Sequence, residues 1–246
     1  MLKIKNLSVS VGDKKILDDI NLSIPRGEIH VIMGPNGTGK STILKAIMAH
    51  PVYRVDEGSI YFENVRIDKM KPDEIARMGV FLLEQNPTEI PGVTNALMLR
   101  TAMSERGIKE SIFEFNKRLS TSCENLEIPL EFVHRNINES MSGGEKKKNE
   151  LLQIELLKPK LILLDELDSG LDVDGLKKLS EGLLDYKKRE KAAILIITHH
   201  TNILEYLTPD KVYIMKSGHI VMEGDMNLAQ KIEKTGFKGA FSGGEW

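Results

Sequence analysis

The chain has 246 residues, 41% of them apolar, a formal net charge of -2 at pH 7 and a single cysteine, Cys123. This length suits one large α/β domain or a domain with an inserted subdomain, the near-balance of charge argues against nucleic acid as a partner, and one cysteine excludes an intrachain disulfide and a cysteine-only metal site. No run in the sequence approaches the roughly eighteen apolar residues of a membrane span, so we expect a cytoplasmic protein without direct membrane insertion.

The first stretches of the chain alternate apolar and polar residues. This period of two, interrupted by turn-forming residues, predicts antiparallel strands and a small N-terminal β layer. The runs are LKIKNLSVSV (2–11), KILDDINLSI (15–24) and GSIYFENVRI (58–67).

Four later runs are short, continuous and apolar. Runs of this kind are typical of strands in a mostly parallel sheet that is buried on both faces, with helices crossing between the strands. They are EIHVIMG (28–34), MGVFLLE (78–84), KLILLDE (160–166) and AAILIITH (192–199).

A different pattern separates the second and third of these runs. Segments 95–107, 110–126 and 131–137 are expected to be helices, because Gly, Pro and polar residues separate them. We therefore expect an α/β core formed by 1–91 and 145–246, with a helical subdomain at 92–144. Near the end of the chain, 210–225 predicts a hairpin that turns at Ser217 and Gly218, followed by a helix from about Met226 to Lys234.

The strongest chemical signal is GPNGTGKST (34–42), directly after the apolar run EIHVIM (28–33) and directly before a helical stretch. Glycines allow backbone N–H groups to turn toward phosphate oxygens, and a helix N-terminus adds favourable donors. Lys40 should contact the β- and γ-phosphates, and the Ser41 hydroxyl should coordinate Mg2+. The expected nucleotide-binding residues are Gly34, Pro35, Asn36, Gly37, Thr38, Gly39, Lys40, Ser41 and Thr42.

Two carboxylates follow the apolar run 161–164. In an open α/β sheet the carboxyl ends of the strands face the ligand crevice, so Asp165 and Glu166 should point at the phosphate loop. Asp165 is expected to hold Mg2+, and Glu166 to act as the general base for the attacking water. The alternative is an acidic pair that merely starts a helix, and the phosphate loop nearby makes this reading the weaker one.

A second anion-binding turn lies at Ser142, Gly143 and Gly144, at the head of another helix-like stretch. The phosphate loop already holds one side of a nucleotide. The economical arrangement is a head-to-tail dimer in which the Ser142 turn of one subunit closes over the ATP held by Lys40 of the other.

These motifs, in this order, resemble the ATP-binding cassette (ABC) ATPases over nearly the whole chain. The resemblance implies the fold of that family, ATP and Mg2+ as ligands, and roles for further residues. Gln85 resembles the glutamine that senses Mg2+ and water, His199 resembles the histidine that contacts the γ-phosphate, and Ser169–Asp172 resemble the loop that crosses the dimer interface. Val11 stands where many family members carry an aromatic ring against adenine.

Within the family the chain is most similar to the SufC-type ATPases, which serve iron–sulfur cluster assembly. The similarity lies in 85–102, 142–153, 164–177 and 209–225, and the segment PTEIPGV (87–93) is the most telling part of it. The resemblance implies SufB/SufD-type scaffolds as partners. One departure is Glu84, which stands where an aromatic residue is expected before Gln85. The alternative is the nucleotide-binding subunit of an ABC membrane transporter, with a separate membrane subunit.

Overall fold

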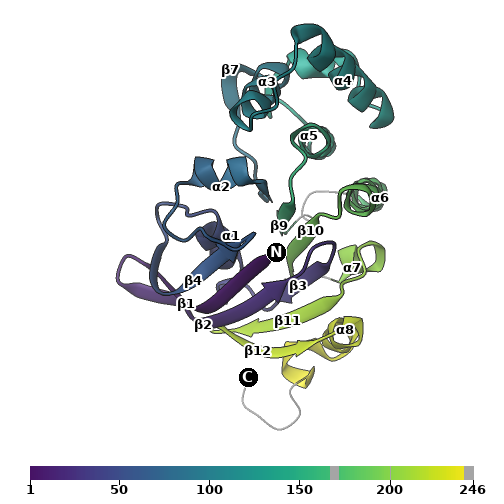
Figure 1. The fold of residues 1–246 in the computed structure, drawn as a ribbon. Coiled ribbons are helices and arrows are strands. Elements are labelled where there is room, and N and C mark those ends of the chain that lie inside the picture. The colour runs from purple at the N-terminus through teal and green to yellow at the C-terminus, as the bar shows by residue number, and fades with distance from the viewer. Residues whose placement is uncertain (167–171, 200, 241–246) are drawn as a thin grey trace.

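The computed structural model describes residues 1–166, 172–199 and 201–240, and its described part contains two main sheets and a set of helices (Figure 1). The strands are β1 Leu2–Val11, β2 Lys14–Ile24, β3 Ile29–Met33, β4 Arg54–Phe62, β5 Val65–Arg66, β6 Val80–Leu83, β7 Ile90–Thr94, β8 Asn136–Ile137, β9 Leu161–Asp165, β10 Ala193–Thr198, β11 Lys211–Lys216 and β12 His219–Gly224. The helices are α1 Lys40–Ile47, α2 Pro72–Met78, α3 Asn95–Glu105, α4 Ile112–Asn125, the 3-10 helix η1 Leu130–His134, α5 Gly143–Leu157, α6 Val173–Glu190, α7 Asn202–Tyr206 and α8 Met226–Ala240.

The larger sheet has six strands in the order β12-β11-β3-β10-β9-β6. Its strands are parallel from β11 to β6, and only β12, the second strand of the predicted hairpin, is antiparallel to its neighbour. The expectation of a mixed, mostly parallel sheet in an α/β core is confirmed.

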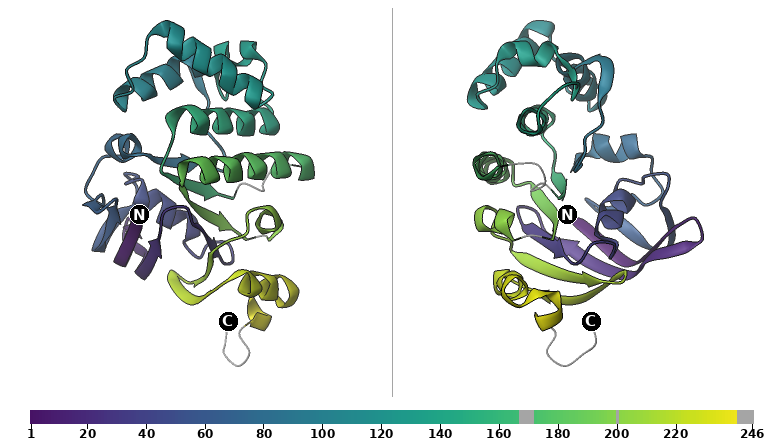
Figure 2. Two further views of the ribbon diagram at one scale, coloured as in Figure 1. Left: turned by 45° about the vertical axis from the view of Figure 1, so that its right-hand side comes forward. Right: turned by 180° about the vertical axis from the view of Figure 1, so that it is seen from behind.

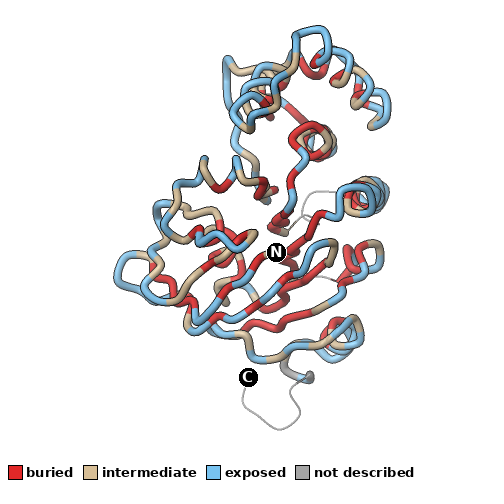
Figure 3. The backbone as a smooth tube through the Cα atoms, in the orientation of Figure 1, coloured by how far each residue is buried: buried red, intermediate tan, exposed pale blue. Residues whose placement is uncertain are grey.

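Alternate residues of the central strands are buried in two different layers. In β9, Leu161 and Leu163 pack into the layer that contains α1, whereas Ile162 and Leu164 pack against the layer that contains α6 and α7. Strand residues alternate between the two faces of a sheet, so a strand covered on both sides must be apolar throughout. This is why the parallel strands are continuous apolar runs in the sequence, and why buried backbone follows them in Figure 3.

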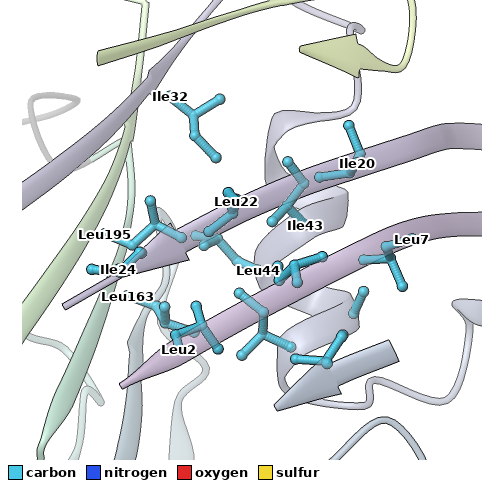
Figure 4. Packing of buried hydrophobic residues seen from close by; sticks show 14 of the residues in the cluster. Leu2, Leu7, Ile20, Leu22, Ile24, Ile32, Ile43, Leu44, Leu163 and Leu195 are labelled. Carbon is cyan, nitrogen blue, oxygen red and sulfur yellow. The ribbon is translucent and has the colours of Figure 1, made fainter. Parts of the chain in front are cut away.

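The N-terminal strands form a separate antiparallel sheet in the order β2-β1-β4-β5. Helix α1 lies between this sheet and the larger one, and its Ile43 and Leu44 join the same apolar cluster as Leu2 of β1 and Leu163 of β9 (Figure 4). The helix that follows the phosphate loop is therefore held on both sides. The run 58–67 was predicted as one strand but is a hairpin, because Glu63 and Asn64 adopt positive φ and reverse the chain.

The helical part of the chain projects beyond the larger sheet (Figure 2). Side chains of α3, α4 and η1 form their own apolar cluster, and α5 completes it with Leu152 and Leu156. Helix α4 begins at a capping box in which Ser111 and Glu114 bind each other's backbone N–H groups. These helices therefore share an apolar cluster of their own, and Phe81 of β6 packs against it from the larger sheet.

The predicted helix at 131–137 is wrong in its second half. The chain leaves η1 with Arg135 in an extended conformation and enters β8, which pairs antiparallel with β7. The carbonyl of Arg135 accepts from the backbone N–H of Asn95, so the extended conformation is fixed by α3. The predicted last helix continues beyond Lys234 to Ala240, with a non-helical residue at Gly236.

Candidate active site

The phosphate loop connects the end of β3 to the start of α1. Gly39, with φ 98°, precedes the first helical residue, Lys40. A Cβ atom on Gly34 would lie 2.4 Å from the carbonyl oxygen of Met215, so the loop passes too close to β11 for a larger residue. Close packing and left-handed backbone together explain the glycines of the motif.

Lys40 is folded back onto this loop. Its ammonium donates to the carbonyl oxygens of Gly34, at 2.8 Å, and Pro35, at 3.0 Å, and the residue is only 5% exposed. Burial lowers the pKa of Lys40, and the charges of Glu166 and Asp165 oppose this shift. Those two carboxylates therefore act on the same ammonium group, as expected for groups that share one site.

The turn of the C-terminal hairpin is hydrogen-bonded to the phosphate loop. The backbone N–H of Gly218 donates to the carbonyl oxygen of Thr38, at 3.1 Å, and the Thr38 hydroxyl donates to the carbonyl oxygen of Pro35, at 2.9 Å. The sequence located the hairpin turn, but it carried no signal that this turn contacts the loop.

Ser41 and Asp165 meet at the N-terminus of α1. The Ser41 hydroxyl donates to Asp165 Oδ1 at 2.8 Å. Burial raises the pKa of Asp165, while the hydrogen bond from Ser41 and the charge of Lys45 lower it. A hydroxyl and a carboxylate oxygen side by side are ligands that suit Mg2+, so the residues fit the metal that the sequence implied.

Glu166 and His199 lie in contact at the ends of neighbouring strands. Glu166 follows β9 with φ 49°, and its backbone N–H donates to the carbonyl oxygen of Ile197. Its Oε1 lies 3.2 Å from Nδ1 of His199. A histidine ring at this distance can orient a carboxylate, which is a requirement for a general base.

The phosphate loop, Gln85 and Glu166 border one surface depression. Thus Gln85, which is 45 residues away from Lys40 along the chain, is brought to the same site. Ile16 borders it too, although no sequence motif includes this residue. The described residues that line the depression are Ile16, Asn36, Gly37, Gly39, Lys40, Ser41, Thr42, Gln85 and Glu166.

The predicted second anion-binding turn lies at the N-terminus of α5. Ser142 caps α5: its hydroxyl oxygen accepts from the Glu145 N–H, and the Glu145 carboxylate accepts from the Ser142 N–H at 2.8 Å. Gly143 is the first residue of α5. Ser142 and Gly144 line a cavity of about 550 Å3 between α5, η1 and α6, separate from the depression beside Lys40.

Glu145 holds this turn through several hydrogen bonds. Its carboxylate also accepts from Arg135 at 2.6 Å, and Arg135 donates to the carbonyl oxygen of Ser140. The hydrogen bonds from the Ser142 backbone and from Arg135 lower the pKa of Glu145 to about 2. Of the predicted interface loop Ser169–Asp172, only Asp172 belongs to the described residues, where it caps α6.

An ion pair beside the depression was also missed. Lys45 of α1 contacts the carboxylate of Glu84, the residue before Gln85. The sequence marked Glu84 as unusual for its position, but it gave no indication of a partner on α1.

Comparisons with known proteins agree with this geometry. The family model described as ABC transporter matches residues 17–169. The chain is 46% identical to the probable ATP-dependent transporter ycf16 of Cyanidium caldarium, over 97% of this chain and 95% of that protein. It is also 46% identical to vegetative protein 296 of Bacillus subtilis, over 96% of this chain and 91% of that protein.

A solved ATP-binding cassette, bound to ADP and Pi in a post-hydrolysis state, has the same fold. Its TM-score is 0.78 at 24% identity, with 92% of this chain and 99% of that chain covered. The family match extends over more than half of the chain and includes the phosphate loop, Gln85 and the two carboxylates. The chain therefore belongs to the ABC transporter family and is an ATP hydrolase with the fold of its ATP-binding cassettes.

Proposed function

We propose that this ATP hydrolase couples ATP binding, dimer closure and hydrolysis to shape changes of a SufB/SufD-type scaffold in iron–sulfur cluster assembly. The observation that carries the proposal is a largely exposed segment of SufC-like sequence, 87–93, which begins two residues after Gln85. This segment is joined to the chain before the Ser142 turn, because the carbonyl oxygen of Thr88 accepts a hydrogen bond from Asn138. ATP hydrolysis itself follows from the family, whereas the residue roles, the metal, the dimer and the partner are parts of the proposal.

The phosphate-binding roles follow from the loop. The backbone N–H groups of 34–42, except at Pro35, and the ammonium of Lys40 bind the β- and γ-phosphates, because the N-terminus of a helix such as α1 offers unpaired N–H donors to an anion. Ser41, Asp165 and Gln85 hold Mg2+. When bound, this ion neutralises charge that develops on the phosphate oxygens.

Glu166 is the general base in the proposed mechanism. Its carboxylate takes the proton of the attacking water. His199 orients this carboxylate through Nδ1, and the other side of its ring, at Nε2, contacts the transferred phosphate. Lys40 neutralises the phosphate charge on the opposite side. Glu166 and His199 directly follow β9 and β10, and Lys40 begins α1 after the loop that follows β3.

The Ser142 turn supplies the other half of the site in a head-to-tail dimer. Within one chain, Ser142 and Gly144 line a cavity separate from the depression around Lys40, so a second copy is the simplest source of the turn. Ser142, Gly143 and Gly144 then bind the γ-phosphate across the interface. Ser142→Arg should abolish ATP-dependent dimers in size-exclusion chromatography, because a bulky cation fills the turn. Dimers that persist in this variant would contradict the composite site.

The scaffold contact is assigned to the exposed surface after Gln85. Ile90 is 42% exposed, and the carbonyl oxygen of Thr88 accepts from Asn138 Nδ2 at 2.9 Å. Residues 92–144 are proposed to move with α5 as one helical subdomain, so dimer closure changes the position of this surface. The cluster itself is cargo of the partner: Cys123 is buried, and the described residues contain no group of three His, Cys, Asp or Glu side chains that could hold a metal ion.

Purification of the tagged chain from its own cells under anaerobic conditions tests the partner. We expect soluble proteins that carry iron or cluster-ligating cysteines, and we expect Ile90→Lys to lose them. Val221→Lys is the matched control, because Val221 is similarly exposed, at 43%, on β12. Partners retained equally by Ile90→Lys would contradict the assigned surface.

The alternative function is that of the nucleotide-binding subunit of a membrane transporter, as the name of the Cyanidium caldarium relative suggests. No helix among the described residues is long and apolar enough to cross a membrane, so this function requires a separate membrane subunit. A multi-span protein that co-purifies only in detergent would favour it over the scaffold.

A further inference from the structure

Two carboxylates occupy equivalent places on neighbouring strands. Strands β6 and β9 are parallel, and Leu83 of one is paired in register with Leu164 of the other. The residues that follow are Glu84 and Asp165, so both acidic side chains emerge at the same edge of the sheet. The sequence motif accounts for Asp165 but assigns nothing to Glu84.

Helix α1 contacts both carboxylates from one face. Ser41 and Lys45 are four residues apart, which places their side chains one above the other on a helix. Ser41 donates to Asp165 at 2.8 Å, and the Lys45 ammonium forms an ion pair with Glu84. The phosphate-loop helix is therefore attached to the ends of two adjacent strands by two parallel contacts.

From this geometry we propose that Lys45 and Glu84 are a positioning pair, which holds the chain at Gln85 against α1 and thereby places the Gln85 side chain beside Ser41 and Asp165. The proposal rests on the role of Gln85 in the proposed function. Neither Lys45 nor Glu84 is a ligand of nucleotide or metal in this arrangement, and both act through their neighbours.

Lys45 also balances the charge at this edge. The Lys45 ammonium contacts the Glu84 carboxylate, and Glu84 and Asp165 follow the paired residues Leu83 and Leu164 on neighbouring strands. Without its ammonium partner, Glu84 would be an uncompensated carboxylate next to Asp165. Removal of either member of the pair therefore changes both the position of Gln85 and the charge around Asp165.

The first experiment compares Glu84→Gln, Lys45→Gln and the double variant in the full chain. Partners that orient metal ligands typically change activity or metal affinity by about 10- to 100-fold. We expect each single variant to lower kcat about tenfold and to raise the half-saturating Mg2+ concentration, and the double variant to be no worse than the singles, because each single change already breaks the pair. Asp73→Asn, which breaks the surface pair with Arg77 on α2, is the control and should leave kcat unchanged.

The second experiment separates positioning from a general loss of structure. Binding of a fluorescent ATP analogue without Mg2+ should stay within about twofold of wild type in both single variants, and the charge-reversed double variant Lys45→Glu, Glu84→Lys should recover part of kcat. The proposal would be overturned by a wild-type kcat in Glu84→Gln, or by effects of the two single changes that multiply in the double variant. It would also be overturned if nucleotide binding without Mg2+ fell by the same factor as kcat. Gln85→Ala separates the proposed role of Gln85 from the proposed role of the pair. A fully active Gln85→Ala variant would contradict the role of Gln85. An impaired Gln85→Ala variant beside a fully active Glu84→Gln variant would contradict only the positioning pair.

Discussion

Asn149 provides a test of how the helical part is joined to the segment after Gln85. Its side chain is fully buried on α5, and its amide donates to Asn95 Oδ1 at 2.9 Å and to Asn138 Oδ1 at 3.4 Å. Asn138 in turn donates to the carbonyl oxygen of Thr88. Replacement of Asn149 by alanine removes the donor and leaves buried acceptors on α3 and before α5.

The expected cost can be worked from these contacts. A buried acceptor left without its donor costs about 1–3 kcal/mol, and the truncated side chain adds the smaller cost of a cavity, so Asn149→Ala should lower the free energy of unfolding by about 2–4 kcal/mol. Urea denaturation followed by circular dichroism measures this change. Asn125→Ala, at an exposed position of α4, should stay within about 0.5 kcal/mol of wild type. A change of less than about 0.5 kcal/mol in Asn149→Ala would refute the reasoning.

A double variant tests the pairing directly. Asn95→Ala and Asn149→Ala each remove the same hydrogen bond, so their effects on the free energy of unfolding should not add, and a coupling of about 0.5–3 kcal/mol is expected. Additive effects would show that the two asparagines are buried independently, and that the polar contacts do not join α3 to α5.

Two further predictions concern the carboxylates. Glu166→Gln should lower steady-state hydrolysis about 10²- to 10⁴-fold while ATP binding persists, and unchanged hydrolysis would show that Glu166 is not the base. The pKa of Glu145 is about 2 in the folded chain, below the ordinary glutamate value of 4.5, so its charge stabilises the fold above about pH 4.5 and this contribution is lost as the pH falls toward 2. Glu145→Gln keeps an acceptor for the Ser142 N–H but loses the charge, so urea denaturation between pH 5 and 3 should show a smaller loss of stability than in wild type; parallel losses would refute this linkage.

Local sequence patterns predicted most of the core. Continuous apolar runs identified β3, β6, β9 and β10, because a strand buried on both faces needs an apolar residue at every position. The failures occurred where contacts distant in the chain override local preference. The segment at 131–137 has helical composition, yet Arg135 is extended because its carbonyl oxygen binds the N–H of Asn95 on α3.

The candidate site was predictable as far as its residues are contiguous. The glycines, Lys40 and Ser41 form one motif, and Asp165 with Glu166 forms another, so a chemical role for each could be proposed without coordinates. The contact between Glu166 and His199 could not be assigned in this way, since it depends on which strands are neighbours in the sheet. The same is true of the support that Gly218 gives to Thr38.

Glu84 shows why strand register carries functional information that a motif lacks. VFLLE (80–84) and LILLD (161–165) have the same form, an apolar run that ends in a carboxylate, but they lie about eighty residues apart. Taken separately, the first predicts only the end of a strand, and the second predicts a metal ligand. Once Leu83 is paired with Leu164, the two carboxylates become neighbours, and the four-residue spacing of Ser41 and Lys45 on α1 matches them one to one. Glu84 and Lys45 are therefore explained as a pair, which forms a second contact parallel to that of Ser41 with Asp165.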